Sequence, residues 1–145
     1  MIRLVIKTDY DCWLKIAAEL EHSFGKMVGV PEFESAIQSC IENHTAFCSV
    51  DNNNSITGIV AIDKATNEIS WLGVKNDFRG CGYGKELLET AIENLDKRKP
   101  IIVQTFAPEV KLGIAARNLY LQFGFKDYKN AEKNPAGFET VIMKL

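Results

Sequence analysis

Three glycines on alternate positions mark the segment of the sequence that is best suited to chemistry. Gly80, Gly82 and Gly84 lie in VKNDFRGCGYGKELL (residues 74–88), after an apolar run and before an amphipathic one. Glycine costs conformational entropy on folding, so a local gain should offset it where glycines gather. The first turn of a helix exposes unpaired backbone N–H groups, and glycines let a ligand approach them closely. The segment therefore predicts a cradle for a phosphate or pyrophosphate group.

Three phosphate-binding patterns compete for this segment. The P-loop needs Ser or Thr after Gly-Lys, but Glu86 follows Lys85, and its first glycine position holds Arg79. The dinucleotide fingerprint would need a glycine at position 85. The pattern R-x-x-G-x-G fits, with Arg79, Gly82 and Gly84. A nucleotide-binding domain is thus the weakest interpretation, and a tight turn without a ligand is the structural alternative.

At this pattern the sequence resembles the GNAT superfamily of acyl-CoA-dependent N-acetyltransferases. A second family motif, A-x-x-L-Y-x-x-x-G-F, occurs as Ala116, Leu119, Tyr120, Gly124 and Phe125. The two motifs stand in the family's order, separated by one helix and one strand. The resemblance covers the element order of essentially the whole chain. It implies that acetyl-CoA is the acyl donor and that a primary amine is the acceptor. Both would bind in one ternary complex, in which the amine attacks the thioester directly.

The resemblance also implies which residues hold the cofactor. The glycine loop would bind the pyrophosphate through backbone amides, and the main chain just before it would bind the pantetheine arm. The expected cofactor-binding residues are Leu72, Gly73, Val74, Arg79, Gly80, Cys81, Gly82, Tyr83, Gly84, Lys85 and Asn118. One departure stands out: many members have an asparagine seven residues before the tyrosine, where this chain has Gly113.

Two side chains are the candidates for proton transfer. Tyr120 matches the tyrosine that points toward the CoA sulfur in the family, so it is expected to protonate the leaving thiolate. The alternative is that Tyr120 has only a structural role in the core, because it lies on an apolar helical face. Glu68 is the candidate base, since it has the spacing from Arg79 at which the histone-acetylating branch places its glutamate. The alternative is that Glu68 has no catalytic role and is a solvated carboxylate at the start of a strand. The resemblance makes the backbone N–H of Val74 the oxyanion donor.

Hydrophobic periodicity predicts the elements that position these residues. The expected order is β-α-α-β-β-β-α-β-α-β-β, with strands over residues 2–7, 45–51, 55–63, 68–74, 101–106, 125–129 and 138–145. The resemblance implies a mixed α/β (α+β) fold, with a central, mostly antiparallel sheet flanked by helices. One N-acetyltransferase domain is expected over residues 1–145. In the strand at 68–74, alternation places Glu68, Ser70 and Leu72 on one face and Ile69, Trp71 and Gly73 on the other.

Composition indicates which classes of partner the protein is expected to lack and where in the cell it is expected to lie. The formal net charge is -2, which argues against non-specific binding to nucleic acid or to an anionic membrane. The four cysteines match no zinc spacing, so no metal is expected. No apolar run reaches the roughly 18 residues of a membrane helix. These features favour a cytoplasmic protein.

The acceptor itself is not readable from the sequence. In the family, the loops at residues 24–32 and 129–137 shape the acceptor site, and both carry mixed charges here. A small-molecule or peptide amine is expected, and the acyl group is not limited to acetyl. The last two strands offer an edge that would suit a homodimer. The alternative function is a non-catalytic acyl-CoA-binding sensor or scaffold.

Overall fold

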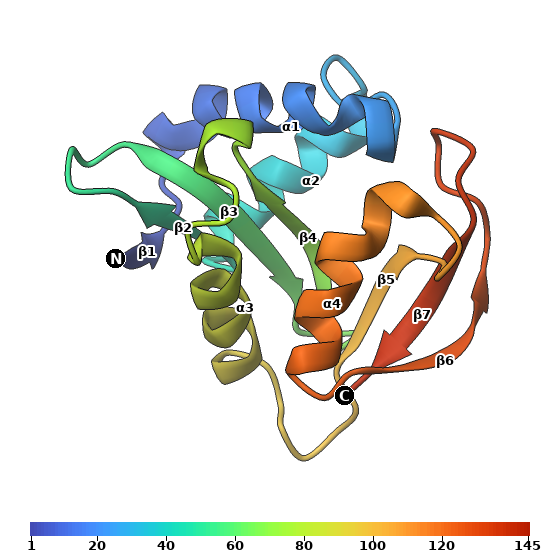
Figure 1. The fold of residues 1–145 in the computed structure, drawn as a ribbon. Helices are drawn as coiled ribbons and strands as arrows, with labels where there is room; N and C mark the ends of the chain where they lie inside the picture. Colours follow the sequence, from blue (N-terminus) through green and yellow to red (C-terminus); the bar gives the residue numbers. More distant parts are fainter.

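Seven strands form one sheet in the order β1-β2-β3-β4-β5-β7-β6 in the computed structural model, which describes all 145 residues (Figure 1). The strands are β1 (Ile2–Leu4), β2 (Ala46–Val50), β3 (Ile56–Asp63), β4 (Glu68–Val74), β5 (Ile102–Phe106), β6 (Lys126–Ala131) and β7 (Thr140–Lys144). Neighbouring strands pair antiparallel, except β4 and β5, which are parallel. The expected mixed, mostly antiparallel sheet is confirmed.

Helices cover both faces of the sheet (Figure 1). They are α1 (Tyr10–Phe24), α2 (Pro31–Glu42), α3 (Tyr83–Glu93) and α4 (Ile114–Gln122). The first two bury Trp13, Ile16 and Ile37 in one apolar core, and the last two bury Leu87 and Tyr120 in another. Burial of these stripes of apolar side chains is the main force that holds the helices on the sheet.

The faces of β4 differ from the alternation expected from the sequence. The register with β3 shifts between Ile69 and Trp71, so Ser70 has no pairing partner and forms a bulge. As a result, Ile69 and Leu72 both pack in the core under α3 and α4, while Trp71 packs against α1 and α2. The prediction that placed Ser70 and Leu72 together, opposite Ile69, was wrong because an extra residue in a strand reverses the alternation that follows it.

A gap opens between the two parallel strands. They pair only at their beginnings, where Glu68 lies opposite Ile102 and Ile69 opposite Val103. Beyond these pairs β4 and β5 diverge, as the V-shaped opening between them shows (Figure 1). The carboxyl end of β4, at Val74, therefore lacks a neighbour on its β5 side.

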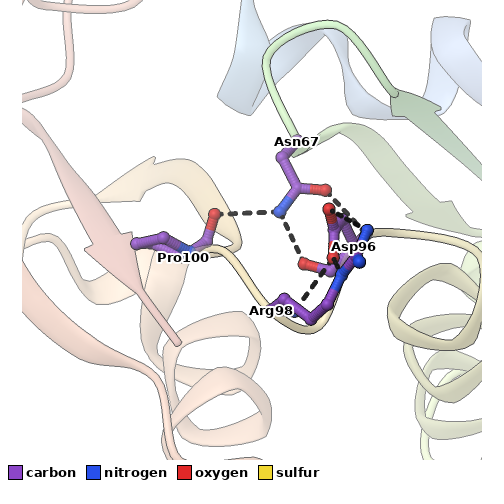
Figure 2. A network of polar contacts seen from close by, with 4 residues as sticks. All are labelled: Asn67, Asp96, Arg98 and Pro100. Atoms are coloured by element: carbon purple, nitrogen blue, oxygen red, sulfur yellow. Dashed lines mark hydrogen bonds and ion pairs between the residues drawn. The ribbon is translucent and has the colours of Figure 1, made fainter.

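The closed end of this gap is held by a network around Asn67 (Figure 2). The Asn67 amide donates to the carbonyl oxygens of Asp96 (2.9 Å) and Pro100 (3.0 Å), and its Oδ1 accepts from the Asp96 N–H (2.8 Å). The Asp96 carboxylate in turn accepts from the backbone N–H of Arg98 at 3.0 Å. The turn before β4 is thereby tied to the connection from α3 to β5, which fixes where the two strands begin to diverge.

Candidate active site

A cleft of about 630 Å³ lies where β4 and β5 diverge. It is lined by β4, β5, the glycine loop, α4, the last turn of α1 and residues of the β6–β7 connection. These elements lie on both faces of the sheet, so the cleft passes through the sheet at the gap. A ligand can therefore enter from one face and meet a second ligand that enters from the other.

The glycine loop presents a row of unpaired amides at the start of α3. None of the six backbone N–H groups of residues 80–85 has an acceptor in the protein, and the first paired one is that of Glu86, which donates to the Gly82 carbonyl (3.2 Å). Gly80 (φ 75°) and Gly82 (φ 88°) are left-handed, a conformation that side chains disfavour. The loop and the helix dipole together are suited to binding an anion.

Two cations lie beside these amides. Arg79 and Lys85 both line the cleft, both are exposed, and neither forms a salt bridge within the protein. A lysine in the first turn of a helix opposes the helix dipole, and a bound anion would remove that conflict. Tyr83 also lines the cleft, with its ring against Phe78 at 6.0 Å between centroids. The charges complement a pyrophosphate.

The main chain of β4 is free on the side of the gap. The Lys75 N–H donates to β3 (2.9 Å), so the alternate residues Leu72 and Val74 direct their N–H and C=O groups toward β5. The ladder with β5 has already ended there. Gly73 is required by packing, because a Cβ at this position would lie 2.6 Å from Leu20 Cδ1. The strand thus offers unpaired polar groups to a ligand in the cleft.

Tyr120 lines the cleft from α4. Its side chain is only 4% exposed, and its ring packs edge-on against Phe125. The hydroxyl makes no hydrogen bond within the protein. Burial raises the pKa of the Tyr120 phenol well above its ordinary value, so the hydroxyl keeps its proton at neutral pH. A protonated hydroxyl without a partner is ready to donate to a ligand.

An ion pair fixes the helix that carries Tyr120. Arg117 is buried and makes two hydrogen bonds of 2.8 Å to the Asp127 carboxylate at the start of β6. It also donates to the Phe106 carbonyl at 3.2 Å. Because one guanidinium joins α4 to both β5 and β6, the helix is held at the open end of the gap.

Glu68 lies away from the cleft. It is the first residue of β4, at the closed end of the gap, and its carboxylate accepts a hydrogen bond from the Thr66 hydroxyl (2.8 Å). It is not among the residues that line the cleft. This position gives the expected role of general base no support.

Two further expected residues also lie outside the cleft. Cys81 is exposed, its Sγ donates to the Arg79 carbonyl, and it lines a separate hollow beside Met1 and Glu86. Only its backbone N–H belongs to the row of free amides. Asn118 is exposed on α4 and does not line the cleft.

Phe106 explains the glycine that replaces the expected asparagine. A Cβ at Gly113 would overlap the Phe106 Cβ, so no side chain fits at this position while Phe106 holds its place. Phe106 lines the cleft and is almost fully buried. The space near the asparagine position is therefore taken by an aromatic ring.

The side of the cleft under α1 contains residues that sequence reasoning missed. They are His22, Ser23, Phe24, Gln104, Asn134 and Thr140. Asn134 Nδ2 donates to the Ser23 carbonyl (2.9 Å), and a Cβ at Gly25 would lie 2.5 Å from Pro135 Cβ. The loops at 24–32 and 129–137 thus touch across this side. The only signal in the sequence was the glycine and proline content of the two loops.

The structure contains no group of three or more His, Cys, Asp or Glu side chains placed to hold a metal ion. None of its helices has the length and apolarity needed to cross a membrane.

Comparisons with known proteins agree with this geometry. Residues 15–145 match the family described as "Acetyltransferase (GNAT) domain". Among solved structures, a GNAT-family acetyltransferase from Bacillus cereus is 17% identical, with a TM-score of 0.78 and coverage of 100% of this chain and 95% of that one. Comparison with curated protein sequences gives no match.

Two other solved structures show the same fold. A putative acetyltransferase from Salmonella typhimurium, solved with acetyl-CoA, is 15% identical with a TM-score of 0.77, covering 100% of this chain and 92% of that one. The ribosomal-protein-S18-alanine N-acetyltransferase from Escherichia coli is 22% identical with a TM-score of 0.69, at the same coverages.

Proposed function

Because this chain belongs to the GNAT acetyltransferase family, we propose that it binds acetyl-CoA in the cleft between β4 and β5 and acetylates a primary amine. The observation that carries the proposal is the row of six unpaired amides at residues 80–85, beside two unpaired cations. We further propose that residues 1–145 form a single N-acetyltransferase domain.

The donor is held by main chain more than by side chains. The amides of residues 80–85 donate hydrogen bonds to the pyrophosphate oxygens, with Arg79 and Lys85 as the counter-charges. The free N–H and C=O groups of Leu72 and the free C=O group of Val74 bind the pantetheine amides, much as an added strand would. The positions of Asn118 and of the Cys81 thiol support no contact with the donor, so both side chains are left out of this set.

The chain's own residues supply the proton and the charge stabilisation. Bound acetyl-CoA provides the acetyl group as a thioester, which an amine can attack directly. Val74 N–H stabilises the negative charge that develops on the carbonyl oxygen. Tyr120 donates its proton to the departing sulfur and regains one from solvent. The proton of the amine passes to water or to His22, the only imidazole that lines the cleft.

The first experiment compares thermal shifts with acetyl-CoA, CoA, NAD and ATP at equal concentration. A ligand that binds only the folded state raises the melting temperature. Shifts with acetyl-CoA and CoA alone are expected. A shift only with ATP or NAD, or none with either CoA compound, would contradict the proposal.

The second experiment measures CoA release over a panel of primary amines. Amine-dependent release is expected from an acetyltransferase. Binding of acetyl-CoA without transfer to any amine would favour the alternative function, a non-catalytic acyl-CoA sensor or scaffold.

Partners and location complete the proposal. The acceptor is a small-molecule or peptide amine, and four unpaired thiols fit a reducing compartment such as the cytoplasm. For the homodimer expected from the sequence, β6 is indeed an edge strand, but it carries Lys126 and Lys129, which oppose edge-to-edge pairing. Sedimentation of the purified chain measures whether it is a dimer. If it is, the two copies are expected to meet at a surface other than the β6 edge.

A further inference from the structure

The cleft contains no carboxylate. None of the residues that line it is Asp or Glu, and its only permanently charged side chains, Arg79 and Lys85, lie at the glycine loop. The side under α1, where the acceptor enters if the loop holds the donor, therefore offers no counter-charge to a cationic substrate. Glu21 and Glu139 adjoin lining residues on this side in the sequence, and both are engaged elsewhere. The Glu21 carboxylate accepts the N–H groups of Met27 and Val28, and the Glu139 carboxylate pairs with Lys133 at 3.6 Å.

Aromatic rings form the wall of this side. The Phe24 ring lies 6.4 Å from Trp71 and 6.0 Å from Phe106, centroid to centroid, and Phe138 stacks edge-on against Phe106 at 6.0 Å. Three of these rings, Phe24, Trp71 and Phe106, line the cleft. The wall can bury an apolar or aromatic group and can attract one ammonium through its ring faces.

Apart from His22, the polar groups on this side are uncharged amides and hydroxyls. The Gln104 amide donates to the Thr140 hydroxyl (3.0 Å), and both residues line the cleft with Asn134. The carboxyl end of α1 also faces the cleft, and a helix carries partial negative charge at that end. These groups suit a single ammonium that must soon lose its proton.

A second ammonium group on the acceptor has no counter-charge on this side of the cleft. Moving a charged group out of water without a counter-ion is costly, and no carboxylate compensates for it here. The contact between Asn134 and Ser23 also closes part of this side, so a long acceptor cannot easily extend past it. The cleft therefore selects against amines that carry further positive charge near the reacting nitrogen.

We propose that the acceptor is a primary amine on an apolar or aromatic group without a second positive charge, and this inference rests on the acetyl transfer proposed above. Two sources share this chemistry: an arylalkylamine and the amino terminus of a short peptide whose first residue is apolar. In the reaction, the amine nitrogen bonds to the acetyl carbon and the carbon–sulfur bond breaks. The ammonium first loses one proton to water or His22, and after the nitrogen has bonded to the acetyl carbon it loses a second to water. The sulfur takes its proton from Tyr120, which regains one from solvent.

The direct test is binding of matched amines to the CoA-loaded protein, measured by calorimetry. Hexylamine and 1,6-diaminohexane have the same length and differ in one ammonium group. We expect hexylamine and 2-phenylethylamine to bind about tenfold or more tightly than the diamine, which corresponds to about 1.4 kcal/mol. Equal or tighter binding of the diamine, or no binding of any of the three, would overturn the inference.

A variant that adds a carboxylate to the cleft tests the same inference from the side of the protein. Gln104→Glu adds a carboxylate to the lining of the cleft at constant size. The ratio of diamine to monoamine affinity should rise about tenfold in this variant. The matched control Gln38→Glu adds the same charge on the exposed face of α2 and should leave the ratio unchanged. Equal ratios in both variants would show that the amine does not bind beside Gln104.

Transfer assays separate the two sources and the two proposals. Acetylation of 2-phenylethylamine but not of a Phe-Gly-Gly peptide identifies a small amine, and the reverse identifies a peptide terminus. Acetylation of 1,6-diaminohexane or spermidine in preference to both overturns the inference while the acetyl transfer stands. Selective binding of monoamines without any transfer would support the inferred acceptor preference and contradict the proposed acetyl transfer.

Discussion

Tyr120 and Glu68 both have side chains that are able to transfer a proton, but their surroundings differ. Tyr120 is buried beside the cleft with an unpartnered hydroxyl, and burial keeps its pKa high. Glu68 lies at the closed end of the gap and is already hydrogen-bonded to Thr66. A side chain takes part in catalysis only where it reaches the reacting atoms, so the two residues call for opposite predictions.

Replacing Tyr120 by Phe should lower kcat by about 10²-fold, because the proton donor is lost. The dissociation constant of acetyl-CoA should stay within about twofold, since the ring and its packing on Phe125 remain. Steady-state kinetics and calorimetry measure the two quantities. Tyr128→Phe, an exposed tyrosine on β6, is the control. Wild-type kcat in Tyr120→Phe would remove this residue from the mechanism.

Replacing Glu68 by Gln should leave kcat/KM within about twofold across the pH range, because the carboxylate lies outside the cleft. The measurement is a pH–rate profile of variant and wild type side by side. Loss of an ionisation on the acidic limb of the profile, together with a large fall in rate, would restore Glu68 as the base.

At the scale of elements, the active site depends on a loop and a gap, each of which has its own structural support. The loop relies on left-handed glycines that keep six amides free, and the gap relies on the network around Asn67 at its closed end. Both supports can be weakened by single substitutions that leave every proposed catalytic side chain in place.

Gly82→Ala should weaken acetyl-CoA binding about tenfold, because a side chain at φ 88° strains the loop and shifts its amides. Gly29→Ala is the matched control, since Gly29 also has a positive φ (82°) and open space around its Cβ position, but lies outside the cleft. Each variant should lose about 1–2 kcal/mol of stability in urea denaturation. Equal binding by both variants would mean that the cradle is not at residues 80–85.

Asn67→Gly should reduce the free energy of unfolding by about 2–3 kcal/mol, because three hydrogen bonds are lost and the Asp96 N–H loses its acceptor. Glycine retains the backbone conformation at φ 59°, so the loss reports the side chain alone. Asn54→Gly, at φ 62° in an exposed turn, should change stability by less than about 0.5 kcal/mol. Similar losses in the two variants would show that the network contributes little.

At the scale of the whole molecule, stability in acid should depend on how α4 is joined to the sheet. The hydrogen bonds from Arg117 lower the pKa of Asp127 below its ordinary value. A lowered carboxyl pKa adds stability above the unfolded-state pKa of about 3.9, and this contribution is lost as the pH falls through the folded-state pKa.

Asp127→Asn should therefore lower the Tm at pH 7, and the difference from wild type should narrow below about pH 4. Thermal melts from pH 7 to pH 2 measure it. Glu89→Gln, which changes an exposed glutamate in the middle of α3, should run parallel to wild type. A Tm difference for Asp127→Asn that is constant with pH would contradict an origin in the carboxylate charge.

Features that arise from neighbouring residues could be predicted from the sequence. The glycine loop, the motif that places Tyr120 on a helix, and the strand at 68–74 were all predicted, and their family is confirmed. Helix starts, left-handed glycines and apolar stripes depend on interactions within a few positions, so the local order of residues is enough to predict them.

Which residues share the cleft depends on the three-dimensional fold and could not be predicted from local patterns. The bulge at Ser70 reversed the faces of β4, and the parallel register placed Glu68 at the closed end of the gap. The contact between Asn134 and Ser23 joins residues 111 positions apart, and the absence of carboxylates from the cleft follows from such contacts. Strand register and loop contacts depend on packing between distant segments, which no local pattern records.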